Sequence, residues 1–277
     1  MKIGIGLPVD DPDVLQEWAV RADAGPFSTL GLLDRLVWHN PEPLVTLAAL
    51  AGVTSRIRLQ TEVLLAPLRG TALLAKQVAT LDRLCGGRFT LGLGIGGRAD
   101  DHAAAGVELR GRGRRFDAQL TRMRELWGAS PDAIGPAPAS PGGPELLFGA
   151  FRPAALARVA RFGDGLLCAA PPSWAGDLFR AVEHDWAEHA RPGRPRLVGQ
   201  VNVALGPDDV VDAARAAMGA YYGFTGNADH MLGGLLTAPG RVRDAVGAFA
   251  DLGADEVVLY CWATDVAQVD RMADLVS

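Results

Sequence analysis

The chain has 277 residues, of which 49% are hydrophobic, and its formal net charge is −5 at neutral pH. This length suits one large α/β domain over residues 1–277, because (β/α)₈ barrels typically have about 250 residues. The negative charge, without a basic cluster interleaved with aromatic residues, argues against a nucleic-acid partner.

The cysteines and the first residues indicate a reduced, cytoplasmic protein. Cys85, Cys168 and Cys261 are far apart and odd in number, which is unlike a disulfide framework. Residues 2–7 form a short apolar run followed by two aspartates, which predicts a first strand rather than a signal peptide. No run approaches the roughly 18 apolar residues of a membrane span, so we expect no membrane association.

Strand-like and helical patterns alternate along the whole chain. The predicted strands are residues 2–7, 29–33, 57–65, 89–95, 145–148, 165–169, 197–205 and 256–261. The predicted helices are 13–23, 43–51, 71–84, 112–127, 153–162, 174–189, 208–222 and 239–252, with a closing helix at 266–276. Residues 128–144 predict a surface connection. Eight apolar strands alternating with helices favour a parallel (β/α)₈ barrel over an open sheet.

In such barrels the chemistry lies on the loops after the strands. The residues at these positions are Asp34, Arg35, Trp38, His39, Ala66, Pro67, Arg69, Gly94, Gly96, Gly97, Arg98, Asp100, Asp101, His102, Phe151, Arg152, Ala169, Ala170, Pro171, Trp262 and Thr264. The lysines, Lys2 and Lys76, lie elsewhere, which excludes a Schiff-base mechanism. Metal-ligand, nucleophile-elbow and phosphate-loop motifs are missing, so we expect no metal site. A borrowed cofactor is the simplest source of chemistry.

Several motifs carry a resemblance to a known family. Residues 61–69, TEVLLAPLR, are followed by LLAKQVATLDRLCGGR at 73–88 and by GLGIGG at 92–97. At this spacing they closely resemble the bacterial luciferase-like family of flavin-dependent oxidoreductases. The resemblance covers most of the chain and implies a barrel that holds FMN or coenzyme F420.

Asp34, His39 and His102 are the candidate catalytic residues. Asp34 resembles the acidic residue that lies near the deazaflavin ring in the family's F420 enzymes. By residue type alone it is equally a loop or helix-capping aspartate. The next residue in those enzymes is often a catalytic histidine, but here it is Arg35, which puts proton transfer in doubt. His39 and His102 are possible substitutes from neighbouring loops, or ordinary surface histidines.

Glu62 and Val63 are expected to contact the cofactor. The resemblance implies a cis peptide bond between them, behind the central ring. The alternative is that Glu62 is a polar residue facing the barrel interior. In either case a buried carboxylate needs a hydrogen-bond donor, such as an arginine, a water molecule or a flavin N–H.

The remaining cofactor contacts are expected on three later loops. Gly94 and Gly96 let a flat ring lie over the mouth, or only permit a tight turn, and the residues after Gly97 are not expected to open a helix. Phe151, Arg152, Ala169 and Ala170 resemble the phosphate end of the family's site, where Pro153 begins a helix whose N-terminus attracts anions. Three roles are open for the Arg152 guanidinium. It binds the phosphate directly, it fills the site and excludes a phosphate, or it is a solvated surface group.

The substrate pocket is predicted from aromatic residues. Trp38, Tyr221, Phe224 and Trp262 suit an apolar or aromatic small molecule, although Tyr221 and Phe224 are equally explained by packing in a lid formed by residues 221–233. The predicted helix 43–51 is apolar nearly all round, and the resemblance implies dimers formed near this point. We therefore expect a homodimer.

We predict a luciferase-like monooxygenase that uses reduced FMN and O₂ on a small apolar or aromatic substrate. The FMN is reduced by a separate flavin reductase or by NAD(P)H. FMN is favoured because the usual F420 histidine and phosphate glycines are missing. The alternatives are an F420-dependent hydride-transfer oxidoreductase and a non-catalytic flavin-binding or structural barrel.

Overall fold

The computed structural model describes residues 1–8, 14–128, 133–226 and 228–276. Ten strands form its sheet: β1 (Lys2–Gly6), β2 (Thr29–Leu32), β3 (Arg58–Thr61), β4 (Leu64–Leu65), β5 (Phe89–Gly94), β6 (Glu145–Gly149), β7 (Gly165–Cys168), β8 (Arg196–Val203), β9 (Leu235–Leu236) and β10 (Glu256–Cys261). The parallel pairing runs β1-β2-β3-β5-β6-β7-β8, with β4 paired to β5 and β9 to β8, and β10 pairs with both β8 and β1. The sheet therefore closes, and the predicted (β/α)₈ barrel is confirmed.

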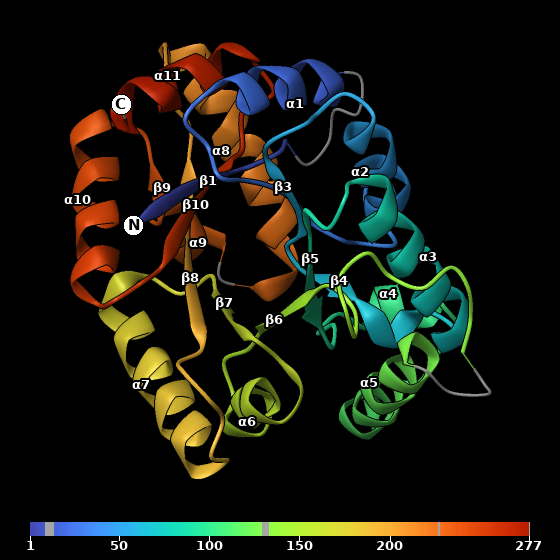
Figure 1. The fold of residues 1–277 in the computed structure, drawn as a ribbon. Helices are drawn as coiled ribbons and strands as arrows, with labels where there is room; N and C mark the ends of the chain where they lie inside the picture. The colour runs from blue at the N-terminus through green and yellow to red at the C-terminus, as the bar shows by residue number, and fades with distance from the viewer. Residues whose placement is uncertain (9–13, 129–132, 227, 277) are drawn as a thin grey trace.

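Helices surround the barrel, as Figure 1 shows. The α-helices are α1 (Leu15–Ala24), α2 (Pro43–Ala51), α3 (Thr71–Leu84), α4 (Ala99–Ala104), α5 (Arg112–Trp127), α6 (Pro153–Phe162), α7 (Pro172–Glu188), α8 (Asp208–Tyr222), α9 (Ala228–Leu232), α10 (Pro239–Asp251) and α11 (Ala267–Val276). Two 3₁₀ turns, η1 (Ala66–Leu68) and η2 (Gly223–Thr225), follow β4 and α8. Most buried apolar residues lie between the strands and these helices.

Local sequence signals explain several helix ends. The Glu42 carboxylate caps α2 by accepting a hydrogen bond from the Val45 N–H at 2.7 Å, and Pro43 occupies the first turn, where its missing N–H costs nothing. Proline also lies in the first turn of α6, α7 and α10. The structure confirms the predicted bounds of five helices, which are α2, α3, α5, α6 and α8.

The structure corrects other predicted bounds. The predicted strand 57–65 is two strands, β3 and β4, because Glu62 and Val63 interrupt it. The loop after β5 opens the short helix α4, which was not expected. The predicted lid contains η2 and α9, and β9 follows it. Residue 13 of the first predicted helix and residues 129–132 of the predicted connection lie outside the described residues.

The inner face of the barrel is unusually rich in glycine on one side. Gly4 and Gly6 of β1, Gly31 of β2, and Gly92 and Gly94 of β5 all point their missing side chains at groups that fill the interior. The opposite side is filled by Leu147, Leu167, Val198 and Val258, against which Val63 packs. Because side chains alternate along a strand, these positions fix which residues of β6, β8 and β10 face inward.

Ion pairs occupy the N-terminal end of the barrel interior. The Arg196 guanidinium binds the carboxylates of both Glu145 and Glu256. Arg58 lies 3.6 Å from the same Glu145 carboxylate, and the Ser28 hydroxyl donates to Glu256. These charges lie at the N-terminal end of the barrel. Residues at that end of a (β/α)₈ barrel usually stabilise the fold, because the active site lies at the opposite end.

The contact between Gly92 and β3 provides a test of the interior packing. A Cβ atom at Gly92 would lie 1.9 Å from the Thr61 carbonyl oxygen, whereas a Cβ at Gly97 would meet nothing within 4 Å. We expect Gly92→Ala to lower the free energy of unfolding by about 1 to 3 kcal/mol, because backbone must move. Gly97→Ala, measured beside it by urea denaturation, should change it by less than about 0.5 kcal/mol. Equal effects would contradict this packing.

Candidate active site

The C-terminal mouth of the barrel has a partly exposed floor on one side. Val63, Gly149, Ala169, Gln200 and Asn202 form this mouth floor; Val63 packs against Gly149, and the others extend inward-facing rows of β6, β7 and β8. They are small residues and amides, in contrast to the closely packed layer beneath them. The mouth floor is therefore open to a flat molecule that offers hydrogen-bonding groups.

The other side of the mouth is filled by two large side chains. The Glu62 carboxyl group occupies the space beside Gly31, where an added Cβ would lie 1.9 Å from Oε1, and the Tyr260 ring occupies the space beside Gly6. Both side chains are buried. The glycines of β1 and β2 are therefore needed to admit Glu62 and Tyr260 into the interior.

Glu62 and Val63 are joined by a cis peptide bond, which confirms the bond implied by the resemblance. Glu62 Oε1 accepts a hydrogen bond from Gln60 Nε2 at 3.1 Å. Burial raises the pKa of Glu62 to about 8, and the nearby Glu256 carboxylate adds to the rise, while the Gln60 hydrogen bond opposes it. Glu62 therefore faces the barrel interior as a carboxylic acid that is mostly neutral at pH 7.

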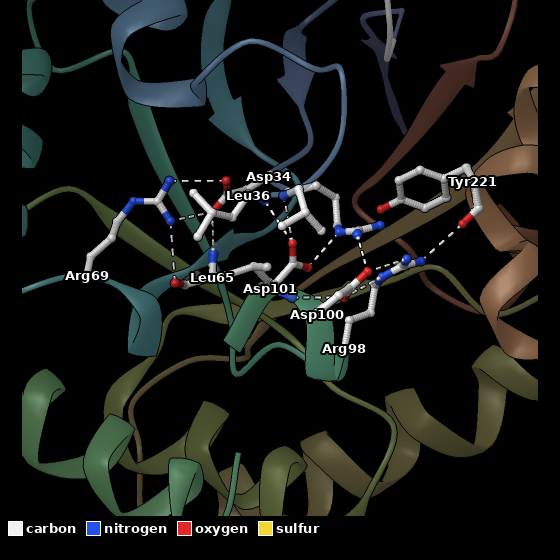
Figure 2. A network of polar contacts seen from close by, with 10 residues as sticks. Asp34, Leu36, Leu65, Arg69, Arg98, Asp100, Asp101 and Tyr221 are labelled. Atoms are coloured by element: carbon white, nitrogen blue, oxygen red, sulfur yellow. Dashed lines mark hydrogen bonds and ion pairs between the residues drawn. The ribbon is translucent and has the colours of Figure 1, made fainter. Parts of the chain in front are cut away.

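A buried ion pair connects the loops around the mouth. Arg35 Nε donates to Asp101 Oδ2 at 2.6 Å, and the backbone N–H groups of Leu36 and Val37 donate to Asp101 Oδ1 at 3.0 Å. Arg35 also lies over the Tyr221 ring, 5.5 Å from its centroid. Figure 2 shows how this network joins the loop after β2 to α4 and to the end of α8.

The outer part of the network is more exposed. Asp100 accepts hydrogen bonds from Arg98 at 2.8 Å and from Arg35 at 3.4 Å. The Arg98 hydrogen bond lowers the pKa of Asp100 to about 2. Arg98 also donates to the Tyr221 carbonyl oxygen at 3.3 Å, so the loop after β5 holds the C-terminal end of α8.

Asp34 is fully engaged by other protein groups. Its Oδ2 accepts hydrogen bonds from the Leu65 N–H at 2.8 Å and from Arg69 Nη1 at 2.6 Å, and its Oδ1 accepts from Arg69 Nη2 at 3.1 Å (Figure 2). This bridge ties the end of β2 to β4 and η1. In this arrangement Asp34 positions the loops and has no oxygen free of a donor.

The two candidate histidines occupy different environments. His39 is exposed beside the Trp38 ring, with centroids 5.6 Å apart. His102 is buried in α4, with its Nε2 3.2 Å from the place where a Gly96 Cβ would lie. Neither ring nitrogen of His102 has a hydrogen-bond partner among the described residues. Gly96 has a φ of +68°, a conformation that glycine adopts without strain, and this brings the loop against His102.

Three of the four predicted pocket residues meet in one cluster. The Tyr221 ring lies edge-on to Trp38 at 5.5 Å and is 5.3 Å from Trp262, and Tyr222 adds to the cluster. Phe224 lies apart, 54% exposed, where its ring covers the Arg98 guanidinium at 3.7 Å. The structure therefore brings Trp38, Tyr221 and Trp262 together beside the mouth and leaves Phe224 outside.

The predicted phosphate end lies on the rim after β6 and β7. Phe151 stacks on Trp174 with ring centroids 5.4 Å apart, and Arg152 is exposed as the residue before α6. Ala169 is exposed and Ala170 is buried. Gly94 lies against the Val63 side chain, where an added Cβ would be 2.5 Å away, so its role here is to admit Val63.

Two cavities in the described structure lie away from the mouth. One, of about 580 Å³, opens at the N-terminal end of the barrel beside Arg191, Arg194 and Arg196, and the other, of about 430 Å³, lies between Gly206 and α11. No three metal-ligating side chains gather within the described ranges. No helix there is long and apolar enough to cross a membrane.

Comparison with known proteins decides the family. The model of the luciferase-like monooxygenase family matches residues 3–274. The chain belongs to this family. The luciferase-like chain is also 31% identical over 179 residues to an uncharacterised protein of Mycobacterium tuberculosis. That match covers 60% of this chain and 64% of the relative, which is less than two thirds of the relative's length.

Solved structures share the whole fold at low sequence identity. A monooxygenase from Streptomyces bottropensis superposes with a TM-score of 0.81 at 20% identity, over 99% of this chain and 97% of the other. An F420-dependent secondary alcohol dehydrogenase, solved with an F420–acetone adduct, gives 0.83 at 18% identity, over 99% and 98%. The oxygenating component of 3,6-diketocamphane monooxygenase from Pseudomonas putida, solved with FMN, gives 0.75 at 18%, over 100% and 97%.

Sequence reasoning missed three residues that shape this luciferase-like mouth, and it placed Asp101 on the rim without giving it a role. Gln200 and Asn202 are polar positions in an otherwise apolar strand, and their period-2 spacing with Val198 was the available signal. Tyr260 carried no comparable signal. The role of Asp101 depends on Arg35 and that of Tyr260 on Gly6, and both partners lie far away in the sequence.

The buried Arg35–Asp101 pair gives a testable prediction. Asp101→Ala leaves the buried Nε of Arg35 and two backbone N–H groups without an acceptor, so we expect the free energy of unfolding to fall by about 3 to 5 kcal/mol in urea denaturation. The matched control is Glu125→Ala, which breaks the exposed Arg122–Glu125 pair and should cost less than about 1 kcal/mol. Similar losses in both variants would show that the buried pair has no special role.

Proposed function

We propose that this luciferase-like protein is a flavin-dependent monooxygenase that uses reduced FMN and O₂ on a small apolar or aromatic substrate. The observation that carries the proposal is the mouth floor, which lies beside the cis Glu62–Val63 bond. Apart from Val63, its residues are small or carry amides, and a Cβ atom at Gly149 would lie only 3.1 Å from Val63. Such a surface suits one face of a planar ring with polar edges.

The polar groups around the mouth also fit a flavin-type cofactor. Buried atoms without a hydrogen-bond partner among the described residues include Glu62 Oε2, Gln60 Oε1 and Trp38 Nε1. Buried polar atoms are normally paired, because leaving one unpaired costs about 1 to 3 kcal/mol. A ring with carbonyl and N–H groups on its edge is the kind of ligand that pairs such atoms.

The rim after β6 offers a place for the phosphate of FMN. Arg152 is exposed there, without an ion-pair partner in the part of the chain that the structure describes, and it directly precedes α6. The first N–H groups of a helix and the positive end of its dipole attract anions, and a guanidinium adds a charged hydrogen bond. We infer that Arg152 and α6 hold the phosphate.

In this proposal, bound reduced FMN supplies the electrons for oxygen chemistry, and the protein supplies the environment. Trp38, Tyr221 and Trp262 form an apolar wall that contacts the substrate and excludes water. Arg35 and Asp101 hold that wall in place through Tyr221. Asp34 keeps the ends of β2 and β4 together and takes no part in proton transfer.

The alternative is an F420-dependent hydride-transfer oxidoreductase. The likeness to an F420-dependent secondary alcohol dehydrogenase supports it, because the two chains share their fold over nearly their whole length. Arg35 stands where the F420 enzymes often have a catalytic histidine, and it is held by Asp101, so we favour FMN. A third possibility, a non-catalytic flavin-binding or structural barrel, predicts binding without turnover or no binding.

A spectroscopic titration tests these possibilities. The purified protein is titrated separately with FMN, anaerobically reduced FMN and F420, and shifts in visible absorption and fluorescence are recorded. We expect saturable binding of FMN in both redox states, and oxygen consumption with reduced FMN when an apolar substrate is present. Exclusive binding of F420 would replace the proposal by the alternative, and binding of none would favour a structural barrel.

Arg152→Ala tests the phosphate end separately. Because a charged hydrogen bond is worth about 1.5 to 3 kcal/mol, FMN should bind roughly ten to a hundred times more weakly. Riboflavin, which lacks the phosphate, should bind as before, and the exposed Arg180→Ala serves as control. Tighter FMN binding would mean that Arg152 blocks the site, and no change would place the phosphate elsewhere.

We also propose a cytoplasmic homodimer that is served by a flavin reductase or by NAD(P)H. The cysteines Cys85, Cys168 and Cys261 are free and buried. Val45 on α2 is 66% exposed, and Leu73 on α3 is 63% exposed, so these adjacent helices offer apolar surface to a second copy. Light scattering at micromolar concentration should give twice the 29.1 kDa chain mass, and a monomer would contradict the proposal.

A further inference from the structure

Glu62 and Val63 are consecutive residues whose side chains both face the interior. Val63 packs against Gly94 and Gly149 on the side of β5 and β6, whereas Glu62 lies beside Gly31 of β2. In a regular strand, neighbouring side chains point to opposite faces. The break between β3 and β4 therefore brings a carboxyl group to the edge of the mouth floor.

The two carboxyl oxygens of Glu62 differ in their hydrogen bonds. Oε1 accepts from Gln60 Nε2. Oε2 is buried and has no partner within the described ranges. In a neutral carboxylic acid the oxygen that accepts the Gln60 bond is best the carbonyl oxygen, so Oε2 carries the hydroxyl. That hydroxyl is a donor that lacks an acceptor.

The charges around Glu62 favour this neutral form. Glu62 is 9% exposed, and the titratable groups that act on it electrostatically are Glu256 and Tyr260, both of β10. Glu256 carries its own pair with Arg196, and no cation of the described chain binds Glu62. Burial without a counter-charge raises the pKa of Glu62 to about 8, in the direction that keeps the proton on the acid.

Other acids and bases near the mouth are less available. The Asp34 oxygens are all engaged by Arg69 and Leu65. His39 is exposed on Trp38, and His102 lies behind Gly96. Of the two carboxyl groups, Glu62 is thus the one that combines an unpaired oxygen with a position beside the mouth floor.

We propose that Glu62 binds the cofactor ring as a neutral carboxylic acid, donating a hydrogen bond from Oε2 to an acceptor atom on the ring edge. This rests on the proposed function, because it assumes a flavin-type ring over the mouth floor. It reverses the role considered from the sequence, in which a Glu62 carboxylate would accept a hydrogen bond from an arginine, a water molecule or a flavin N–H. The acid form binds and the carboxylate form does not.

The proposal predicts a pH-dependent affinity. The dissociation constant of FMN is measured from about pH 7 to about pH 9.5 for the wild type, Glu62→Gln, Glu62→Leu and the surface control Glu125→Gln, with circular dichroism at each pH to confirm folding. Wild-type affinity should be constant up to the pKa near 8 and then fall about tenfold per pH unit, as the neutral fraction does. Glu125→Gln should follow the wild type.

The two Glu62 variants separate hydrogen bonding from charge. Glu62→Gln keeps a donor at the Oε2 position, so its affinity should stay flat over the same range. Glu62→Leu lacks the donor, and we expect about tenfold weaker binding at neutral pH with no pH dependence. Infrared spectra of the free protein should also show a carboxylic acid C=O band that disappears above the pKa of Glu62 and is missing in Glu62→Gln.

The outcomes distinguish this inference from the proposed function. If the wild type binds neither FMN nor F420 at any pH, the proposed function fails. If it binds FMN with a flat profile, or if Glu62→Gln loses affinity in parallel with it, the flavin site stands and the role of Glu62 is overturned. A parallel loss would report ionisation of the flavin itself.

Discussion

A closed parallel barrel must fill its interior with side chains. In this barrel some strands contribute large inward-facing side chains, and others contribute only glycine. The strands β1, β2 and β5 contribute glycine to the inner face, so side chains from β10 and from the break between β3 and β4 fill it. Glu62, Val63 and Tyr260 enter the space that the glycines leave. The glycines on the inner face therefore decide where these three side chains lie. In this way they also decide which chemical groups line the mouth.

Electrostatic pairing then fixes the loops around the mouth. Asp34 with Arg69, and Asp101 with Arg35, are both buried pairs in which backbone N–H groups supply further hydrogen bonds. Removing charges from water is expensive, and the hydrogen bonds around each carboxylate compensate part of that cost. The result is a rim whose loops from β2, β4 and β5 hold one another, while the Tyr221 end of α8 attaches through Arg35 and Arg98.

The sequence predicts the scaffold better than the site because their signals have different ranges. Alternating apolar runs are local, and they place the eight barrel strands and most helices, with α4 and the break at Glu62–Val63 as the main departures. Trp38 and Trp262 of the aromatic cluster were predicted from strand ends and Tyr221 from the expected lid, whereas Phe224, predicted with them, lies outside it. The engagement of Asp34 by Arg69 was not, since it depends on how two loops approach each other. The neutral state of Glu62 likewise depends on Gly31 and Glu256, which no local pattern relates to it.

The ion pairs at the N-terminal end of the barrel affect how open the barrel interior is to solvent. Arg196, bound to Glu145 and Glu256, and Arg58 beside them block the interior from below. Charged side chains therefore fill the interior beneath Glu62, and the mouth floor is the partly exposed side of the barrel. A ring seated on the mouth floor would stand between Glu62 and bulk solvent, and the acid would keep the protonation state that it had when the ring arrived.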